Sequence, residues 1–192
     1  MSITKLTSNG LTGSKYDTVS ADNYYMEPIA TTLLSSTAAT ITFDNIPQGY
    51  KHLQIRWIAR SNRTVSPDYL KLNFNGDTGA NYSWHYLIGA GSSALASSSV
   101  SASFAINRAV AGAAQAASVF GTGIADILDY SNVYKYKTAR TLGGYDNNGD
   151  GEISLQSGLW MNTAAVTTIT ITPGAGTLIS ANSRFSLYGI RG

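Results

Sequence analysis

Cysteine is absent from this chain of 192 residues. Without it the protein has no disulfide, no zinc–thiolate site and no thiol nucleophile, and its fold is compatible with either redox compartment. Histidine is nearly absent as well, with only His52 and His85. Two histidines are too few for the common histidine-rich metal sites. These absences exclude several ordinary classes of metalloprotein and cysteine enzyme.

Charge is also scarce, because only 12% of the residues are charged, about half of the usual fraction in soluble proteins. Ser, Thr, Asn and Gly supply the polarity instead, which suits a surface that contacts protein or glycan. The formal charge of +2 comes from 13 basic and 11 acidic residues spread along the chain. The longest basic cluster, Lys135, Lys137 and Arg140, alternates with apolar residues and is interpreted as a solvated strand face. We therefore expect no nucleic-acid partner.

Long apolar runs are missing too. Residues 1–17 lack the apolar core of a signal peptide, and no stretch approaches the roughly 18 apolar residues that span a bilayer. We expect a soluble protein made in a cytoplasm, with no membrane partner.

The first residues differ in composition from the rest. Residues 1–27 are rich in Ser, Thr, Asn and Gly and show no sustained apolar period, which predicts an extended N-terminal arm. The arm carries four large side chains that we expect to dock on the same domain or on a neighbouring subunit: Tyr16, Tyr24, Tyr25 and Met26. The alternative is a first edge strand of the same domain.

Residues 28–192 show the period-2 alternation of β-strands. One face of residues 50–60 carries Leu53, Ile55, Trp57 and Ala59, and the other carries polar side chains. Turn signals recur at roughly 8–15 residues, and no 3.6-residue period persists, so we predict an all-β, jelly-roll-like two-sheet β-sandwich. The other predicted strands are 38–43, 70–74, 82–88, 118–130, 136–142, the segment around 159–161, 166–172 and 184–190.

The segment from Ala90 to Ser118 is the least core-like part, because it consists mostly of Ala, Ser and Gly. Its sequence VSASFAI is compatible with an edge strand and AVAGAAQAAS with a short helix. A mobile loop at one end of the sandwich is the alternative.

A candidate calcium loop is the strongest local motif. In DNNGDGEIS the oxygen-bearing side chains Asp146, Asn148 and Asp150 alternate before Gly151, and Glu152 follows, as at the front of a calcium-binding loop. Ser157 stands where a bidentate Glu closes such loops, so a site needs ligands from elsewhere. A hairpin turn rich in Gly, Asn and Asp explains the same letters without metal. No other cofactor is expected.

Catalytic patterns are weak. His52 and His85 fall inside predicted strands without a nucleophile elbow, and we interpret them as sheet histidines. Asp126 and Asp129 are predicted on opposite faces of one strand, which does not make a glycosidase pair. The glycine motifs at 121–123 and 174–176 match neither the Walker nor the dinucleotide pattern and are interpreted as a bulge and a hairpin turn. We expect a protein that is not an enzyme.

Three aromatic residues, Tyr82, Trp84 and Tyr86, share one face of a predicted strand. On a surface they form a platform for stacking sugars, whereas inside the sandwich they form core. The core interpretation is favoured.

Residues 26–192 resemble a group of tailed-bacteriophage virion proteins. The resemblance lies in YKHLQIR, in NFNGDTGANY, in GLWMN with AVTTITIT, and in the terminal FSLYGI. It implies a β-sandwich module on the particle surface, often a homotrimer, whose partners are the major capsid protein or other virion proteins. We expect a capsid decoration (cement) protein located in the virion. The alternative is a tail fibre or adaptor module that contacts a host-surface glycan or other tail proteins, and a small polysaccharide-processing enzyme is a third, weaker hypothesis.

Overall fold

The structure is a computed structural model that describes residues 25–65 and 67–192. Within these residues the chain forms twelve β-strands and no helix. In chain order the strands are β1 Met26–Leu33, β2 Ile41–Phe43, β3 His52–Ala59, β4 Asp68–Phe74, β5 Tyr82–Ala90, β6 Ser93–Ala102, β7 Ala105–Val110, β8 Gly121–Leu128, β9 Lys137–Asp146, β10 Gly151–Trp160, β11 Ile169–Pro173 and β12 Arg184–Ile190.

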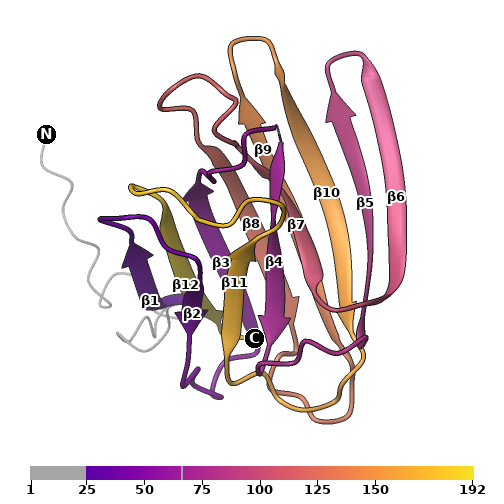
Figure 1. Cartoon of the computed structure of the whole chain (residues 1–192). Coiled ribbons are helices and arrows are strands. Elements are labelled where there is room, and N and C mark those ends of the chain that lie inside the picture. Colours follow the sequence, from indigo (N-terminus) through magenta and orange to yellow (C-terminus); the bar gives the residue numbers. More distant parts are fainter. Residues whose placement is uncertain (1–24, 66) are drawn as a thin grey trace, which may run out of the picture.

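The strands form two antiparallel sheets. The larger has the order β1-β12-β3-β8-β9-β10-β5-β6 and the smaller the order β2-β11-β4-β7. The smaller sheet lies across one face of the larger, and β5 and β6 lie at the side farthest from β1 (Figure 1). The two hairpins β9–β10 and β5–β6 widen the larger sheet, and without them each sheet has four strands. The predicted all-β two-sheet sandwich is confirmed, whereas the jelly-roll assignment stays a prediction.

The core lies between the sheets and follows the alternation in the sequence. On β3 the side chains of Leu53, Ile55, Trp57 and Ala59 are all buried, as predicted. The β4 side chains Leu70, Leu72 and Phe74 are buried in the same cluster. Alternate residues therefore divide each strand into a core face and an outer face.

The two predicted C-terminal strands are present with one change. The last strand spans residues 184–190 as predicted, whereas β11 begins at Ile169 and not at Val166. The side chain of Val166 is buried, and its backbone N–H donates to the Tyr130 carbonyl instead of to a neighbouring strand.

The first described strand begins inside the predicted arm. Strand β1 starts at Met26 and pairs with β12 at the edge of the larger sheet. For Met26 and Glu27 the edge-strand alternative is therefore correct. The rest of the predicted arm, apart from Tyr25, lies outside the described residues.

The low-complexity segment is mainly strand. It forms the edge strands β6 and β7, so the loop interpretation is wrong for most of it. The predicted helix at 109–118 is also wrong, because residues 109 and 110 end β7, Ala111 forms a bridge with Arg60, and turns follow. The turn that follows is held by Arg60, whose guanidinium donates to the carbonyls of Gln115, Ala116 and Val119 at 2.7–2.9 Å.

Both glycine motifs have structural causes. Residues 121–123 lie in β8 in regular register with β3, so the predicted bulge is wrong. A Cβ on Gly123 would come within 2.1 Å of the Trp57 indole, which explains the glycine. Residues 174–176 form a bend after β11, and the predicted hairpin turn is wrong because β11 and β12 lie in different sheets. A Cβ on Gly176 would come within 2.9 Å of an Asp68 carboxylate oxygen.

Candidate functional site

An apolar patch covers part of the outer face of the larger sheet. It consists of six side chains that are 37–61% exposed, namely Ile58, Leu87, Ile124, Leu142, Ile153 and Leu155; we call them the outer patch. They are adjacent by register, because Ile124 pairs with Leu142, Leu142 with Leu155 and Leu155 with Leu87. The result is an apolar row that crosses β8, β9, β10 and β5.

The usual polarity of a sheet is reversed in β10. Its inward residues Ser154 and Gln156 are buried and polar, whereas Ile153 and Leu155 face outward. The buried groups are satisfied, because Gln156 Nε2 donates to Ser154 Oγ and Ser154 Oγ donates to the Gly143 carbonyl. A one-sided sheet normally places its apolar residues on the core face. Large exposed apolar patches mark interaction surfaces, so the outer patch is the candidate functional site.

A hollow adjoins the outer patch. Its volume is about 800 Å³, and its lining includes Ile124, Leu142, Gly144 and Ile153. Gly144 brings no side chain to the sheet face between these larger residues. The outer patch therefore has apolar side chains that project from the sheet and, beside them, a hollow lined mainly by apolar groups.

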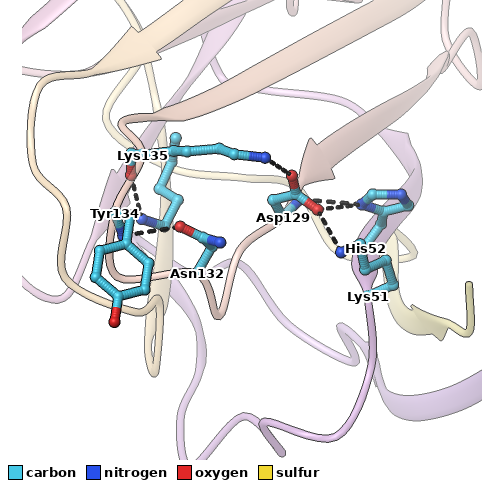
Figure 2. Close-up of polar contacts among 7 residues, drawn as sticks. Lys51, His52, Asp129, Asn132, Tyr134 and Lys135 are labelled. Atoms are coloured by element: carbon cyan, nitrogen blue, oxygen red, sulfur yellow. Dashed lines mark hydrogen bonds and ion pairs between the residues drawn. The ribbon is translucent and has the colours of Figure 1, made fainter.

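A polar cluster is centred on Asp129 at one end of the larger sheet (Figure 2). The Asp129 carboxylate lies 2.7 Å from Lys135 Nζ and 3.4 Å from Lys51 Nζ. The hydrogen bond from Lys135, followed by that from Lys51, holds the Asp129 pKa below its ordinary value. Both lysine side chains are more than half exposed, so these ion pairs contribute little to the stability of the fold.

Of the histidines and carboxylates singled out in the sequence, the structure brings His52 and Asp129 together, with Nδ1 and Oδ1 3.8 Å apart. His52 Nδ1 accepts a hydrogen bond of 2.9 Å from the Asp129 backbone N–H, and His85 is exposed on β5. Asp129 lies in the turn after β8, so its predicted place in the strand is wrong. Asp126 is on β8 and accepts from Gln54 Nε2 at 2.8 Å. His52, Asp126 and Asp129 each have a hydrogen-bonding partner, and both histidines lie in strands as the sequence predicts.

Lys137 departs from the predicted solvated strand face. Its side chain is fully buried, and its Nζ donates to the carbonyls of Lys135 and Thr163 at 2.7 and 3.0 Å. Burial lowers the Lys137 pKa. The lysine ties the turn before β9 to the segment after β10, a role that charge alternation does not reveal.

The candidate calcium loop is the hairpin between β9 and β10. Asp146 Oδ1 accepts hydrogen bonds from the backbone N–H groups of Asn148 and Gly149, at 2.8 and 3.4 Å. Asn148 and Gly149 have φ of 59° and 96°, as such turns require. Glu152 is buried on β10, and Asp150 is exposed. Among the described residues, no group of three or more His, Asp or Glu side chains is arranged to hold a metal ion.

We expect calcium to leave the stability of the protein unchanged, because the turn already satisfies Asp146. A site with a Kd of about 10 μM would add about 2.7 kcal/mol at 1 mM calcium. Thermal unfolding with 1 mM calcium and with excess chelator measures this difference. A melting temperature that rises by several degrees with calcium but not with magnesium would contradict the expectation.

The three aromatic residues of β5 are not equivalent. Tyr82 is fully buried, whereas Trp84 and Tyr86 are half-buried. The Trp84 and Tyr86 rings stack with centroids 5.5 Å apart and an interplanar angle of 13°. The core interpretation is correct for Tyr82 only.

Two of the predicted arm contacts are described. The Tyr25 side chain is 81% exposed, and its carbonyl accepts from the Arg191 N–H at 3.0 Å. Met26 is half-buried in β1, with its sulfur 3.7 Å from Arg56 Nη2. Tyr16 and Tyr24 lie outside the described residues.

Comparisons with known proteins give no relative: no family model, curated protein or solved structure matches this chain. In the described part of the chain, nothing is helical and long enough to cross a membrane. The outer patch therefore has to be interpreted from its own residues.

Proposed function

We propose that this chain is a structural protein of a tailed-bacteriophage virion that binds the outside of the capsid and stabilises the particle. The observation that supports the proposal is the outer patch, since an exposed apolar face on a poorly charged sheet is suited to lasting contacts with other subunits. The sequence resemblance to virion proteins is the reason for placing these contacts on a phage particle. Binding, and not catalysis, is the role assigned to the described residues.

Copy number in the particle tests the proposal. The measurement is quantitative mass spectrometry of purified virions of the encoding phage, with the major capsid protein as the internal reference. A count comparable to that of the capsid protein is expected. A small fraction of that count would move the protein to the tail, and its absence from virions would overturn the proposal.

A second candidate function, a tail module that contacts host glycan, is favoured by the stacked pair Trp84 and Tyr86. Half-buried aromatic rings with one accessible face stack on sugar rings. If this function is correct, Trp84→Ala lowers binding of the purified protein to host cell-wall glycan at least tenfold. Tyr134→Ala is the matched control, because Tyr134 is 87% exposed in a turn away from this pair. Equal binding by wild type and Trp84→Ala would exclude this use of the pair.

A further inference from the structure

We propose that the outer patch binds the outer patch of a second copy of this chain about a two-fold axis. The axis crosses the strands at Gly143, so that Arg140 of each copy faces Asp146 of the other. The inference does not rest on the proposed function: a patch that is paired with a second copy is not free to bind the capsid, so the two contacts compete for the same face. It concerns the protein in solution, before any particle is involved.

The patch is self-complementary about this axis. The inward residues Gly123, Gly143, Ser154 and Ile88 are aligned across β8, β9, β10 and β5 and mark the line of the axis. A half-turn about this line stacks the two copies face to face. On each strand, the outward residue just before the line in one copy then lies over the outward residue just after the line in the other copy.

On β9 the rotation brings Leu142 of one copy over Gly144 of the other, into the hollow described above. The same rotation pairs Leu87 with Gly89 on β5, and Leu155 with Ile153 on β10. On these three strands large residues therefore meet small or apolar ones, whereas on β3 the axis passes Trp57 and places Ile58 over Arg56. Sheets packed face to face lie about 10 Å apart, which leaves room for this interdigitation. Because both sheets twist, the match is closest on β9 and its two neighbours.

Charge selects this axis over the alternative. Arg140 and Asp146 lie three residues before and three after Gly143 on β9, and both are exposed. An axis across the strands places Arg140 of each copy against Asp146 of the other, which makes two pairs of opposite charge. An axis along β9 would instead place Arg140 against Arg140 and Asp146 against Asp146, so that like charges repel. Arg56, the charge at the β3 end of the patch, lines the hollow, and its guanidinium lies 5.4 Å from the Tyr188 ring centroid. On β9, β10 and β5 the two outward rows beside the axis carry no charge.

The area is sufficient for a dimer. Five strands at about 4.8 Å and four outward rows at about 6.8 Å give a flat footprint on the order of 650 Å². Stable interfaces bury about 800 Å² on each partner, and side-chain relief adds to a flat footprint. The area is therefore compatible with a dimer, whereas area alone does not fix its affinity.

Sedimentation velocity on the full chain tests the pairing. Wild type is expected to be a dimer at tens of micromolar. Leu142→Asp places a charge at the centre of the patch and is expected to weaken dimerisation at least a hundredfold while the circular dichroism spectrum is kept. Val133→Asp is the matched control, because Val133 is 54% exposed against 52% for Leu142 and lies in a turn outside the patch. This variant is expected to dimerise as wild type does.

Two results of this experiment would overturn the proposal: a wild-type monomer at 100 μM, or a folded Leu142→Asp that assembles like wild type. A wild-type trimer would also overturn it, because a two-fold contact closes at two copies. None of these results decides the copy number in virions, so the failure of this inference and that of the proposed function are distinguishable.

Cysteine cross-linking tests the register, and the absence of native cysteine makes it clean. In an equimolar mixture of Leu155→Cys and Ile153→Cys, a short bismaleimide is expected to join unlike chains at least threefold more often than like chains. Statistical joining of like and unlike chains would overturn the register. A second variant, Arg140→Asp, tests the charge pairs. It is expected to weaken dimerisation about tenfold, because the introduced carboxylate faces Asp146 of the other copy with a like charge.

Discussion

Replacement of Trp160 by alanine is expected to lower the free energy of unfolding by about 3–5 kcal/mol. The Trp160 side chain is 1% exposed, and its ring centroid lies 5.6 Å from that of Phe74 and 6.3 Å from that of Tyr82. Its Nε1 donates to Asp77 Oδ2 at 2.7 Å. The substitution therefore leaves a cavity between the sheets and removes a hydrogen bond to a carboxylate.

The Asp77 turn is the reason that the effect is large. Tyr82 Oη donates to the Asp77 carbonyl and accepts from the Phe74 N–H, at 3.1 and 3.0 Å. Burial raises the Tyr82 pKa to about 12, so its hydroxyl keeps its proton at any ordinary pH. Trp160 and Tyr82 together fasten the turn between β4 and β5, where the chain crosses from the smaller sheet to the larger.

Urea unfolding of Trp160→Ala, Trp160→Phe and Met161→Ala measures the effect. Trp160→Phe keeps a ring but loses the hydrogen bond, so it is expected to cost less than Trp160→Ala. Met161→Ala is the surface control, and its expected cost is below about 1 kcal/mol. A cost for Trp160→Ala equal to that of Met161→Ala would contradict the packing described here.

The contribution of the hydrogen bond between Trp160 and Asp77 to the free energy of unfolding depends on pH. The bond from Trp160 is the main reason that the Asp77 pKa lies below its ordinary value of 3.8. A carboxyl group with a depressed pKa stabilises the fold above the ordinary pKa and loses this contribution as the pH falls through the folded value. The difference between wild type and Trp160→Phe is thus expected to be full at pH 7 and to shrink below about pH 4. An undiminished difference at pH 2 would show that ring packing accounts for all of it.

The second large effect is expected for Asp68→Asn, at about 2–3 kcal/mol. The Asp68 side chain is fully buried. Its Oδ1 accepts from the N–H groups of Tyr69 and Ala175 at 2.8 and 2.9 Å, and its Oδ2 accepts from the Gly176 N–H at 3.1 Å. An asparagine amide offers only one oxygen, so its NH₂ group faces a backbone donor and one buried N–H loses its partner.

Chemical denaturation at pH 7 compares Asp68→Asn with Asp44→Asn, which makes the same change at an exposed turn residue. The control is expected to cost less than about 0.5 kcal/mol. Hydrogen exchange of the Ala175 and Gly176 amides gives a local measure, and faster exchange is expected in Asp68→Asn alone. Equal stability of the two variants would show that the bend after β11 does not depend on the carboxylate.

Much of the fold follows from alternation in the sequence. The strand at 184–190 and the buried face of β3 were predictable because apolar and polar residues alternate there with the apolar set inward. Strand β6 was predicted only at its end, where VSASFAI was compatible with an edge strand, because SALASSSVSA has little to bury and pairs through its backbone with β5. The pattern of apolar residues in a sequence indicates which side chains are buried. An edge strand can form through backbone hydrogen bonds with little side-chain burial.

The candidate site was harder to predict for a different reason. In β10 the alternation is regular, but Ser154 and Gln156 face inward and Leu155 faces outward. Alternation gives the period and not the direction, so the outer patch needed a structure to be seen. The burial of Lys137 was hard to predict as well. Of the two carbonyls that accept its hydrogen bonds, that of Thr163 is distant in sequence and that of Lys135 lies in a turn. Hydrogen bonds that satisfy buried polar groups are set by tertiary contacts.

The place of β12 between β1 and β3 has a consequence for synthesis of the protein. Strand β1 has β12 as its neighbour in the sheet, and Leu33 pairs with Arg184, about 150 residues later. At about 5–20 residues per second a ribosome needs roughly 8–30 s to make that stretch. During this interval β1 and one edge of β3 await their shared partner, so the nascent chain is most exposed to wrong pairing shortly before its last strand emerges.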